Sequence, residues 1–382
     1  MPWKVDPVTE QRIALVHAVR TAGLSVAEAA RRYGVSRKTA FKWLARHDAE
    51  PDRPLADRSR RPARSPSRTA DDRELIVLEA RDRHGWGPRK LHAHLKAQGH
   101  QAPPIRTIAA ILRRHGRVAA PAAAPPPTPA PQRFERPGPN QLWQLDFKGP
   151  LEVGRCRVVT LSIIDDHSRY LLALRPCADM TYATTQAVLW GLYGEVGMPE
   201  AILCDNAFSA RNTGVGLSGF DAWLIRLGIR PLHGRAYHPQ TQGKVERFHG
   251  TLEREVWPKV RRDESEHFRA DLEAWRPVYN SVRPHEALGD EPPATRWAPS
   301  PRRRPDAVPE ITYPADAEVR VVGQDGSTRW RRARIKVGVG LSGERVRVDD
   351  QGHQVEVYYG THRARVIAAE QLKPGVTAWT MV

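Results

Sequence analysis

The sequence HPQTQGKVERFH, residues 238–249, joins a loop signal to a helix signal. Proline and glycine punctuate its first half, which predicts a loop. Val245 then begins a series of apolar residues at helical spacing that continues through Phe248 to Val256, which predicts a helix. Glu246 falls in the first turn of that helix. The stretch therefore predicts a carboxylate beside a loop, on a helix whose other face is apolar.

Two aspartates end apolar runs earlier in the chain. Asp146 ends residues 142–146 and Asp205 follows residues 201–204, and both runs are typical of buried strands. Carboxylate oxygens are the ligands that Mg²⁺ prefers, and clustered acids without a cation would repel each other. Two such cations about 3.5–4 Å apart stabilise the anionic transition state of phosphodiester cleavage or transfer. With Glu246, the two aspartates form a candidate site for divalent metal.

The composition indicates a polyanionic partner. Lys and Arg number 60 against 43 Asp and Glu, a formal net charge of +17, and 382 residues are enough for several domains. Nucleic acid is the leading partner, although a GC-rich genome also enriches Arg, Ala and Pro. An anionic membrane surface competes, but we find no apolar run of about 18 residues and no signal-peptide pattern, so we expect a cytoplasmic protein without a membrane contact. The scattered Cys156, Cys177 and Cys204 favour neither a zinc site nor a disulfide framework.

The N-terminal residues have the pattern of a helix-turn-helix. A capping box at residues 25–28 begins one predicted helix, Gly34 supplies the turn, and Ser36 can cap a second helix that buries Ala40, Phe41 and Leu44. The alternative is a small helical bundle with a basic, solvated face. In the first interpretation the second helix faces a major groove of DNA with Ser36, Arg37, Lys38, Thr39 and Lys42.

Composition divides the chain into seven segments. Pro-rich stretches alternate with patterned ones, and the Pro/Ala stretch is predicted to form a semi-extended spacer. The second helical segment, also helix-turn-helix-like, is expected to bind DNA or to serve self-association. The predicted segments are 1–49 (helix-turn-helix), 50–67 (linker), 68–117 (second helical unit), 118–136 (linker), 137–289 (catalytic core), 290–310 (linker) and 311–376 (small basic β domain).

Strands come first in the predicted core, and helices alternate with strands later, which favours a mixed sheet with helices on both faces. Residues 157–164 and 169–174 are predicted as a hairpin whose turn holds Asp165 and Asp166. In the last segment, residues 345–348 and 355–359 flank another hairpin turn. A small β-barrel there would present Arg331 and Arg332 to phosphates; the alternative is a solubilising or subunit-contact domain.

Five ordered motifs resemble the integrase-core insertion-sequence transposases of the DDE superfamily. They are WQLDF at 143–147, IDDHSR at 164–169, CDN at 204–206, YHPQTQGKVERF at 237–248 and NSVRPH at 280–285. The resemblance implies a multidomain α/β protein with a ribonuclease H-like core, two Mg²⁺ ions for which Mn²⁺ substitutes, and cut-and-join chemistry on double-stranded DNA by a homodimer or larger assembly.

Carried over by position, Asp146, Asp205 and Glu246 are the implied catalytic metal ligands. Glu246 follows Asp205 by 41 positions, more than is usual in the family, and the surplus fits the Gly-rich residues 212–219. Glu253 and Glu255 remain alternatives for the third acid.

Other residues near Glu246 have open roles. His249 either orients a carboxylate, touches phosphate or is structural. Asn206 and Gln242 are candidates to hydrogen-bond the acids or the DNA backbone, and Lys244 and Arg247 to contact a DNA end. The sequence thus predicts a DNA transposase, with a DNA-binding regulator derived from one and a plain nuclease as alternatives.

Overall fold

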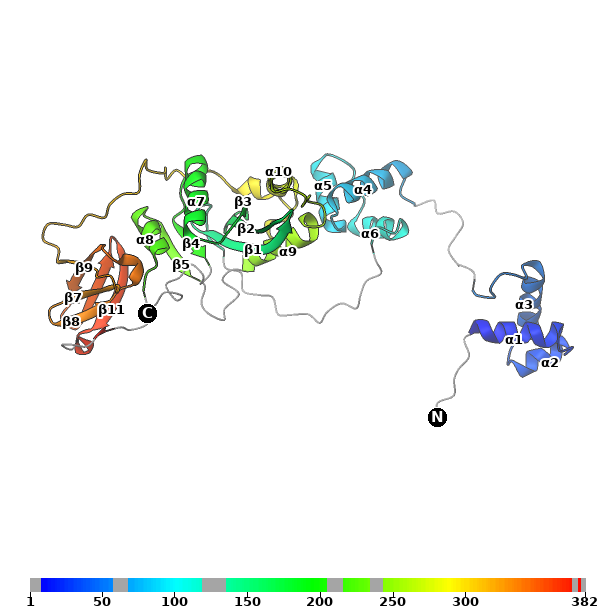
Figure 1. The fold of residues 1–382 in the computed structure, drawn as a ribbon. Coiled ribbons are helices and arrows are strands. Elements are labelled where there is room, and N and C mark those ends of the chain that lie inside the picture. Colours follow the sequence, from blue (N-terminus) through cyan, green and yellow to red (C-terminus); the bar gives the residue numbers. More distant parts are fainter. Residues whose placement is uncertain are drawn as a thin grey trace. The chain divides into compact units, whose positions relative to one another are not determined.

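The computed structural model describes residues 8–57, 68–118, 135–204, 216–233, 243–372 and 377–378 (Figure 1). Two compact units divide the chain, Met1–Arg68 and Thr69–Val382, called unit 1 and unit 2 below.

Unit 1 contains the helices α1 (Val8–Arg20), α2 (Val26–Arg32) and α3 (Arg37–Ala49). The predicted capping box is confirmed, because the Ser25 hydroxyl accepts from the Glu28 N–H while the Glu28 carboxylate accepts from the Ser25 N–H. Ser36 caps α3 by accepting from the Thr39 N–H. Both helix starts were therefore visible in the sequence.

One core assignment in α3 is wrong. Phe41, predicted to be buried, is 58% exposed, whereas Trp43 is only 6% exposed. The buried face of α3 runs through Ala40, Trp43 and Leu44, which are spaced by three and four residues. Phe41 lies about 100° around the helix from Ala40 and therefore points to solvent.

Unit 2 begins with a small helical bundle. Its helices are α4 (Asp71–His84), α5 (Pro88–Ala97) and α6 (Ile105–Arg114). Pro88 occupies the first turn of α5, where its missing N–H costs no hydrogen bond. The bundle has its own apolar core, formed by Val77, Trp86, Leu91, Leu95, Ile108, Ile111 and Leu112.

A mixed five-stranded sheet in the order β3-β2-β1-β4-β5 forms the centre of unit 2. Its strands are β1 (Trp143–Val153), β2 (Cys156–Asp165), β3 (Leu171–Cys177), β4 (Ala201–Cys204) and β5 (Arg230–His233). The first three strands pair antiparallel, and β1 with β4 and β4 with β5 pair parallel. The predicted mixed sheet is confirmed.

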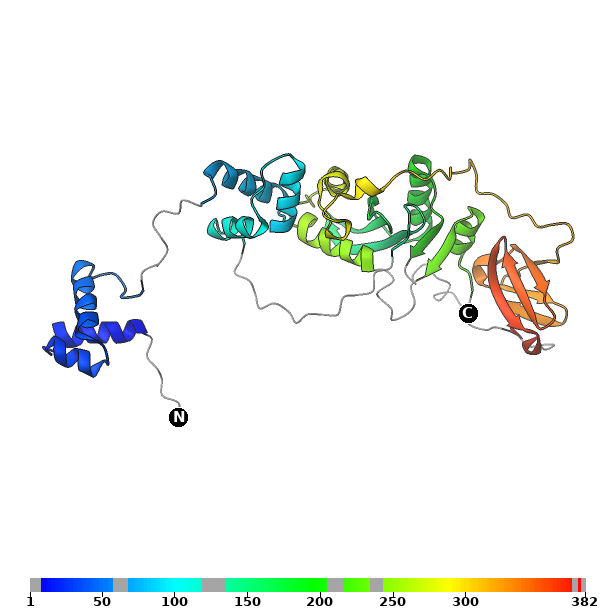
Figure 2. The same cartoon turned by 180° about the vertical axis from the view of Figure 1, so that it is seen from behind.

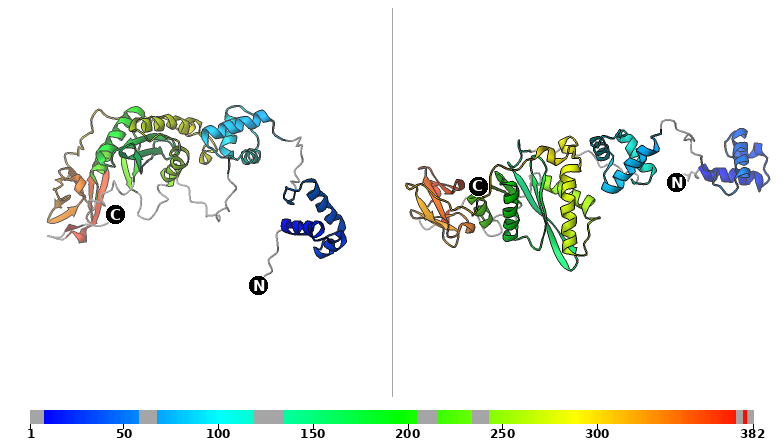
Figure 3. Two further views of the ribbon diagram at one scale, coloured as in Figure 1. Left: turned by 45° about the vertical axis from the view of Figure 1, so that its right-hand side comes forward. Right: turned by 90° about the horizontal axis from the view of Figure 1, so that it is seen from above.

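Helices cover both faces of this sheet (Figure 3). On one face, α7 (Tyr182–Val196) and α8 (Gly219–Arg226) pack onto side chains such as Leu145 and Ile163. On the other face, α9 (Gly243–Thr251) and α10 (Ser265–Pro277) pack onto Ile164 and Leu171. This second face is called the α9 face.

The first strand is longer than the sequence pattern predicts. The predicted strand stops at Asp146, but β1 continues to Val153 and pairs with β2 along its length, with a register irregularity between Lys148 and Leu151. Sequence periodicity is weak beyond Asp146 because this part of β1 is only partly buried. The acid therefore lies inside a paired strand.

The C-terminal strands form two sheets. One has the order β11-β10-β9-β6 and the other β12-β8-β7, and they are the orange and red elements in Figure 2. The predicted turn between β9 and β10 is confirmed, but no strand pairing among the described residues closes the two sheets into the expected barrel. Their apolar faces share one core instead. The strands are β6 (Val319–Val321), β7 (Ser327–Trp330), β8 (Ala333–Lys336), β9 (Arg345–Asp350), β10 (Gln354–Tyr359), β11 (His362–Ala368) and β12 (Thr377–Ala378).

Helix α8 contributes to this C-terminal core as well. Its Ala222 and Ile225 belong to that cluster, while Phe220 and Leu224 face the central sheet. The backbone at the start of α8 also touches the C-terminal part of the chain at Gly340, because a Cβ atom there would lie 2.1 Å from the Ser218 carbonyl carbon. Only glycine permits so close an approach.

Among the residues that the structure describes, no helix is both long and apolar enough to cross a membrane.

The remaining elements are short helical segments. The segments are η4 (Leu252–Val256) and η5 (Val278–Val282), both π-helical, and η6 (Glu286–Leu288), η7 (Pro293–Arg296), η8 (Val339–Leu341) and η9 (Ala369–Gln371).

Candidate active site

Asp146 lies on the α9 face of β1. Its neighbours Trp143 and Leu145 are buried in the core on the opposite face, so strand alternation directs Gln144 and Asp146 toward α9. The Asp146 Oδ1 accepts from the Phe147 N–H at 2.8 Å, and the side chain is 23% exposed. The carboxylate is thus held at a partly open position.

His249 connects α9 to the strand that carries Asp146. Its Nδ1 lies 3.6 Å from the Asp146 Oδ2, and its Nε2 lies 3.2 Å from the Ser162 hydroxyl on β2. Burial, reinforced by the charge of Lys148, lowers the pKa of His249 to about 4. The imidazole is therefore neutral at pH 7 and contacts the carboxylate as a dipole.

Glu246 lies one turn before His249 on α9 and is exposed. Val245 and Phe248 are 0% and 2% exposed in the core of the α9 face, and burying such a side chain contributes roughly 1.5–3 kcal/mol. These apolar residues fix the rotation of α9 about its axis. The helix therefore presents Glu246 outward, within one turn of the residue that contacts Asp146.

The alternative acids are engaged in ion pairs. Glu253 Oε1 lies 2.6 Å from the Lys148 Nζ. Glu255 accepts from the Arg283 guanidinium at 2.8 Å, from the Lys90 Nζ at 2.8 Å and from the Trp86 indole N–H at 3.1 Å. Burial raises the pKa of Glu255, but Arg283 and Lys90 outweigh it and hold this pKa at about 2.

Three predicted participants, Asp205, Asn206 and Gln242, lie outside the described residues. The chain is described up to Cys204, at the end of β4, where Gln144 on β1 pairs with Leu203. Within the described ranges, no group of three His, Cys, Asp or Glu could hold a metal ion. Asp205 lies outside these ranges, so they contain only two of the three predicted acids.

The predicted DNA contacts differ in their surroundings. Arg37, Lys38 and Lys42 are exposed on α3, and Arg247 is exposed on α9. Ser36 and Thr39 instead bond to each other, with 2.9 Å between their hydroxyl oxygens.

At the turn between β7 and β8, Arg331 and Arg332 are both exposed. The Arg331 guanidinium lies 2.7 Å from Asp350 and 4.2 Å from the centre of the Trp330 ring. Arg331 also adopts a φ of 52°, uncommon for a side chain of its size.

Lys244, the other predicted DNA contact on α9, lies beside a buried carboxylate. Its Nζ lies 2.5 Å from the Asp166 carboxylate, and its side chain is only 16% exposed. Asp165 and Asp166 do form the turn after β2, as predicted, but both are buried and bind backbone or side-chain donors from other segments. Sequence reasoning missed this role, because a DD pair after a strand is equally typical of an exposed turn.

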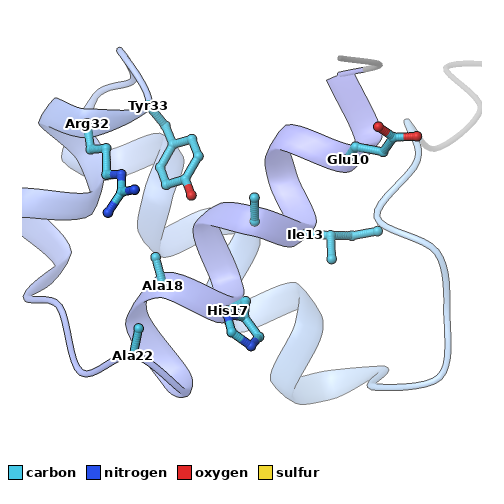
Figure 4. A pocket seen from close by; sticks show the side chains of 8 residues that line it. Glu10, Ile13, His17, Ala18, Ala22, Arg32 and Tyr33 are labelled. Atoms are coloured by element: carbon cyan, nitrogen blue, oxygen red, sulfur yellow. The ribbon is translucent and has the colours of Figure 1, made fainter.

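A separate hollow lies in unit 1 between α1 and α2 (Figure 4). Its volume is about 410 Å³, and Ile13, Ala18, Ala22 and Tyr33 form its apolar part. None of the predicted DNA contacts lines it.

Family comparisons match three parts of the chain. Two models described as "Integrase core domain" match residues 136–239 and 227–293. A model described as "leucine-zipper of insertion element IS481" matches residues 8–82.

Relatives of this chain include insertion-element and viral proteins. The Insertion element IS407 uncharacterized 31.7 kDa protein of Burkholderia multivorans is 27% identical over 234 residues, 57% of this chain and 79% of the relative. The Insertion element IS476 uncharacterized 39.2 kDa protein of Xanthomonas euvesicatoria is 26% identical over 158 residues, 41% of this chain and 44% of the relative. The Gag-Pro-Pol polyprotein of Simian retrovirus SRV-2 is 32% identical over 145 residues, 38% of this chain but 7% of the polyprotein.

A similar solved structure is a cryo-EM structure of the simian T-cell lymphotropic virus intasome in complex with the PP2A regulatory subunit B56 gamma. The match is 18% identical, covers 78% of this chain and 99% of that one, and has a TM-score of 0.36. The sequence matches assign an integrase core domain to residues 136–293, and the chain is similar to proteins of insertion elements.

Proposed function

We propose that this protein is a DNA transposase that binds the terminal inverted repeats of its element, cuts the DNA ends and joins them to target DNA. The contact between Asp146 and His249 carries the proposal, because it brings β1 together with the helix turn that bears Glu246. Two acids that are 100 residues apart in sequence thereby reach the same face of an integrase core sheet.

Asp146, Asp205 and Glu246 are the proposed catalytic acids and ligands of Mg²⁺, or of Mn²⁺ in its place. The donor set fits such a cation, because Asp146 is partly exposed and Glu246 is exposed, and both offer oxygen. Glu253 and Glu255 are poorer candidates because Lys148, Arg283 and Lys90 already neutralise them.

The reaction proceeds in two transfers in this proposal. Cutting forms a bond from a water oxygen to phosphorus and breaks the bond to the 3′ oxygen, which leaves as a hydroxyl. Joining forms a bond from that hydroxyl oxygen to a target phosphorus and releases a target 3′ hydroxyl. When bound, two divalent cations stabilise the charge on the attacking and leaving oxygens. His249 holds the Asp146 carboxylate in place, and Arg247 is available to contact the DNA backbone.

DNA binding is assigned to several parts of the chain. In unit 1, α2 and α3 would act as a helix-turn-helix, with Arg37, Lys38 and Lys42 directed at DNA from α3. We propose the segments 68–117 and 311–376 as further DNA-binding domains, the latter through Arg331 and Arg332. Joining two ends in concert would need at least a homodimer on DNA. We expect the protein to act on DNA in the cytoplasm, at the nucleoid.

A strand-transfer assay tests the proposal. Labelled DNA ends from the flanks of the element are incubated with Mg²⁺ or EDTA and with wild type, Glu246→Gln, Asp205→Asn or Glu253→Gln. We expect metal-dependent nicked and joined products with wild type and with Glu253→Gln, the matched control, and none with the other two variants despite intact DNA binding.

Other outcomes identify a different function. Joining by Glu246→Gln at the wild-type rate would falsify the assigned site. Binding of the DNA ends without nicks in Mg²⁺ would indicate a DNA-binding regulator derived from a transposase. Cutting without joining would indicate a nuclease.

A further inference from the structure

Asp166 is a buried carboxylate that binds three segments of the chain. Its Oδ1 accepts from the Gln144 side-chain amide at 2.8 Å and lies 2.5 Å from the Lys244 Nζ. Its Oδ2 accepts from the Arg136 N–H at 2.8 Å. The residue is only 4% exposed, so all three donors replace water around its charge.

Two of these donors each lie two residues before one of the acids in the sequence. Gln144 precedes Asp146 by two residues on β1, and Lys244 precedes Glu246 by two residues on α9. Because alternate residues of a strand share a face, Gln144 lies on the side of β1 that carries Asp146. Lys244 also donates to the Asp166 main-chain carbonyl at 3.0 Å, so the start of α9 is held twice. The Asp166 side chain therefore clamps β1 to the first turn of α9, through residues that precede each acid by two positions.

We propose that Asp166 is a positioning residue that sets the separation of Asp146 and Glu246, and hence the affinity of this pair for divalent cations. The inference rests on the proposed function. His249, three residues after Glu246, also connects α9 to the sheet through its contacts with Asp146 and Ser162. These contacts hold α9 at two points, one before and one after Glu246 in the sequence, and so oppose a shift of the helix relative to β1.

The effect on cation binding follows from geometry. Mg²⁺ demands near-ideal octahedral coordination at about 2.0–2.1 Å, so a small shift of one carboxylate weakens it. Loss of a residue that supports a metal ligand typically lowers metal affinity by about 10–100-fold. Mn²⁺ binding is therefore a direct readout of the position of the acids, and it needs no DNA.

The neighbouring Asp165 offers a matched control. It is equally buried and accepts from the Asn140 N–H at 2.7 Å and from the Ser168 hydroxyl at 2.6 Å, but these contacts stay within the turn and the segment before β1. Asp165→Asn should disturb the local fold without moving α9. Any general effect of neutralising a buried carboxylate in this turn appears in both variants.

The experiment compares full-length wild type, Asp166→Asn, Lys244→Met, the double variant and Asp165→Asn. Mn²⁺ binding is measured by electron paramagnetic resonance without DNA, and binding of a terminal-repeat duplex and the melting temperature are measured alongside. We expect Asp166→Asn and Lys244→Met each to weaken Mn²⁺ binding by about 10-fold or more. The double variant should lose no more than either single one, because both remove the same link.

The controls decide between positioning and a purely structural role. Asp165→Asn should keep wild-type Mn²⁺ affinity, and duplex binding by Asp166→Asn and Asp165→Asn should match that of wild type. Unchanged Mn²⁺ affinity in folded Asp166→Asn and Lys244→Met would overturn the inference, even if their melting temperatures fell. Should Asp166→Asn not fold, Gln144→Met and Lys244→Met test the two arms of the clamp separately.

Failure of the proposed function gives a different pattern. In that case wild type itself would neither bind Mn²⁺ through Glu246, as judged by Glu246→Gln, nor cut DNA. A wild type that does both, with variants at Asp166 that behave as wild type, refutes the positioning role alone.

Discussion

Glu255 shows how a single buried charge joins two parts of unit 2. Its partners Lys90 and Trp86 belong to the α4–α6 bundle, and Arg283 follows α10. Arg283 is itself 5% exposed, so losing Glu255 would leave a buried cation without its partner. Burial lowers the pKa of Lys90 in spite of this pairing, so desolvation offsets part of the gain.

Acid should weaken this contact. The pKa of Glu255 is about 2 in the folded protein against an ordinary value of 4.5, so its stabilisation is complete above pH 4.5 and is lost as pH falls toward 2. The shift corresponds to roughly 3 kcal/mol at most. We expect the melting temperature of wild type to fall more steeply between pH 5 and pH 3 than that of Glu255→Gln. Parallel pH dependence in the two proteins would contradict this assignment.

At the scale of elements, the α9 region was the most predictable from sequence. The apolar series Val245, Phe248, Leu252 and Val256 is buried throughout, as predicted, although the last turns become the π-helical η4. The reason is that one face of this helix packs on the sheet, so period and burial coincide. Helix caps were predictable because the capping side chain and the N–H from which it accepts are three residues apart in the sequence.

Features that depend on distant partners were not predictable. The link between Asp166 and Lys244 joins residues 78 positions apart, and neither side chain has a sequence pattern that indicates its partner. Phe41 and Trp43 illustrate a second limit. These two aromatic residues are two positions apart in α3, and the sequence pattern does not show which of them faces the core. Asp205, the second predicted acid, lies outside the described residues and stays a prediction.

The two aromatic residues of α3 should separate stability from DNA binding. Trp43→Ala should destabilise unit 1 by about 3–5 kcal/mol, since it empties a core position under the Arg12 guanidinium. Phe41→Ala should change stability by less than about 0.5 kcal/mol yet weaken binding to terminal-repeat DNA, because Phe41 is exposed between Lys38 and Lys42. Calorimetry and fluorescence anisotropy measure the two effects. Wild-type DNA affinity in Phe41→Ala would exclude this face of α3.

On the scale of the whole molecule, the total of 60 Lys and Arg overstates the cations available to DNA. Lys90, Arg283 and Lys244 are committed to buried carboxylates. The exposed cations that remain, such as those of α3, are the ones expected to release counterions when DNA binds.

Salt dependence should therefore identify the cations that contact phosphate. Replacing Lys38 by Gln should weaken DNA binding about equally for all sequences and reduce the slope of log affinity against log salt by about 1. Arg53→Gln is the matched control, because Arg53 is exposed in the same unit but is paired with Glu50. Equal slopes for wild type and Lys38→Gln would show that this lysine does not contact the backbone.

Helix α8 has a consequence for how the protein can be divided. Ala222 and Ile225 fill the C-terminal core, while Phe220 and Leu224 fill the core of the central sheet. We therefore expect that the C-terminal sheets cannot be detached from the central sheet. We also expect cooperative unfolding to extend across the Pro-rich connector 290–310. A calorimetric scan of the intact chain should show the central sheet and the C-terminal sheets melting in a single transition. Removal of residues 311–382 should leave an aggregation-prone remainder rather than a smaller, independently folded protein.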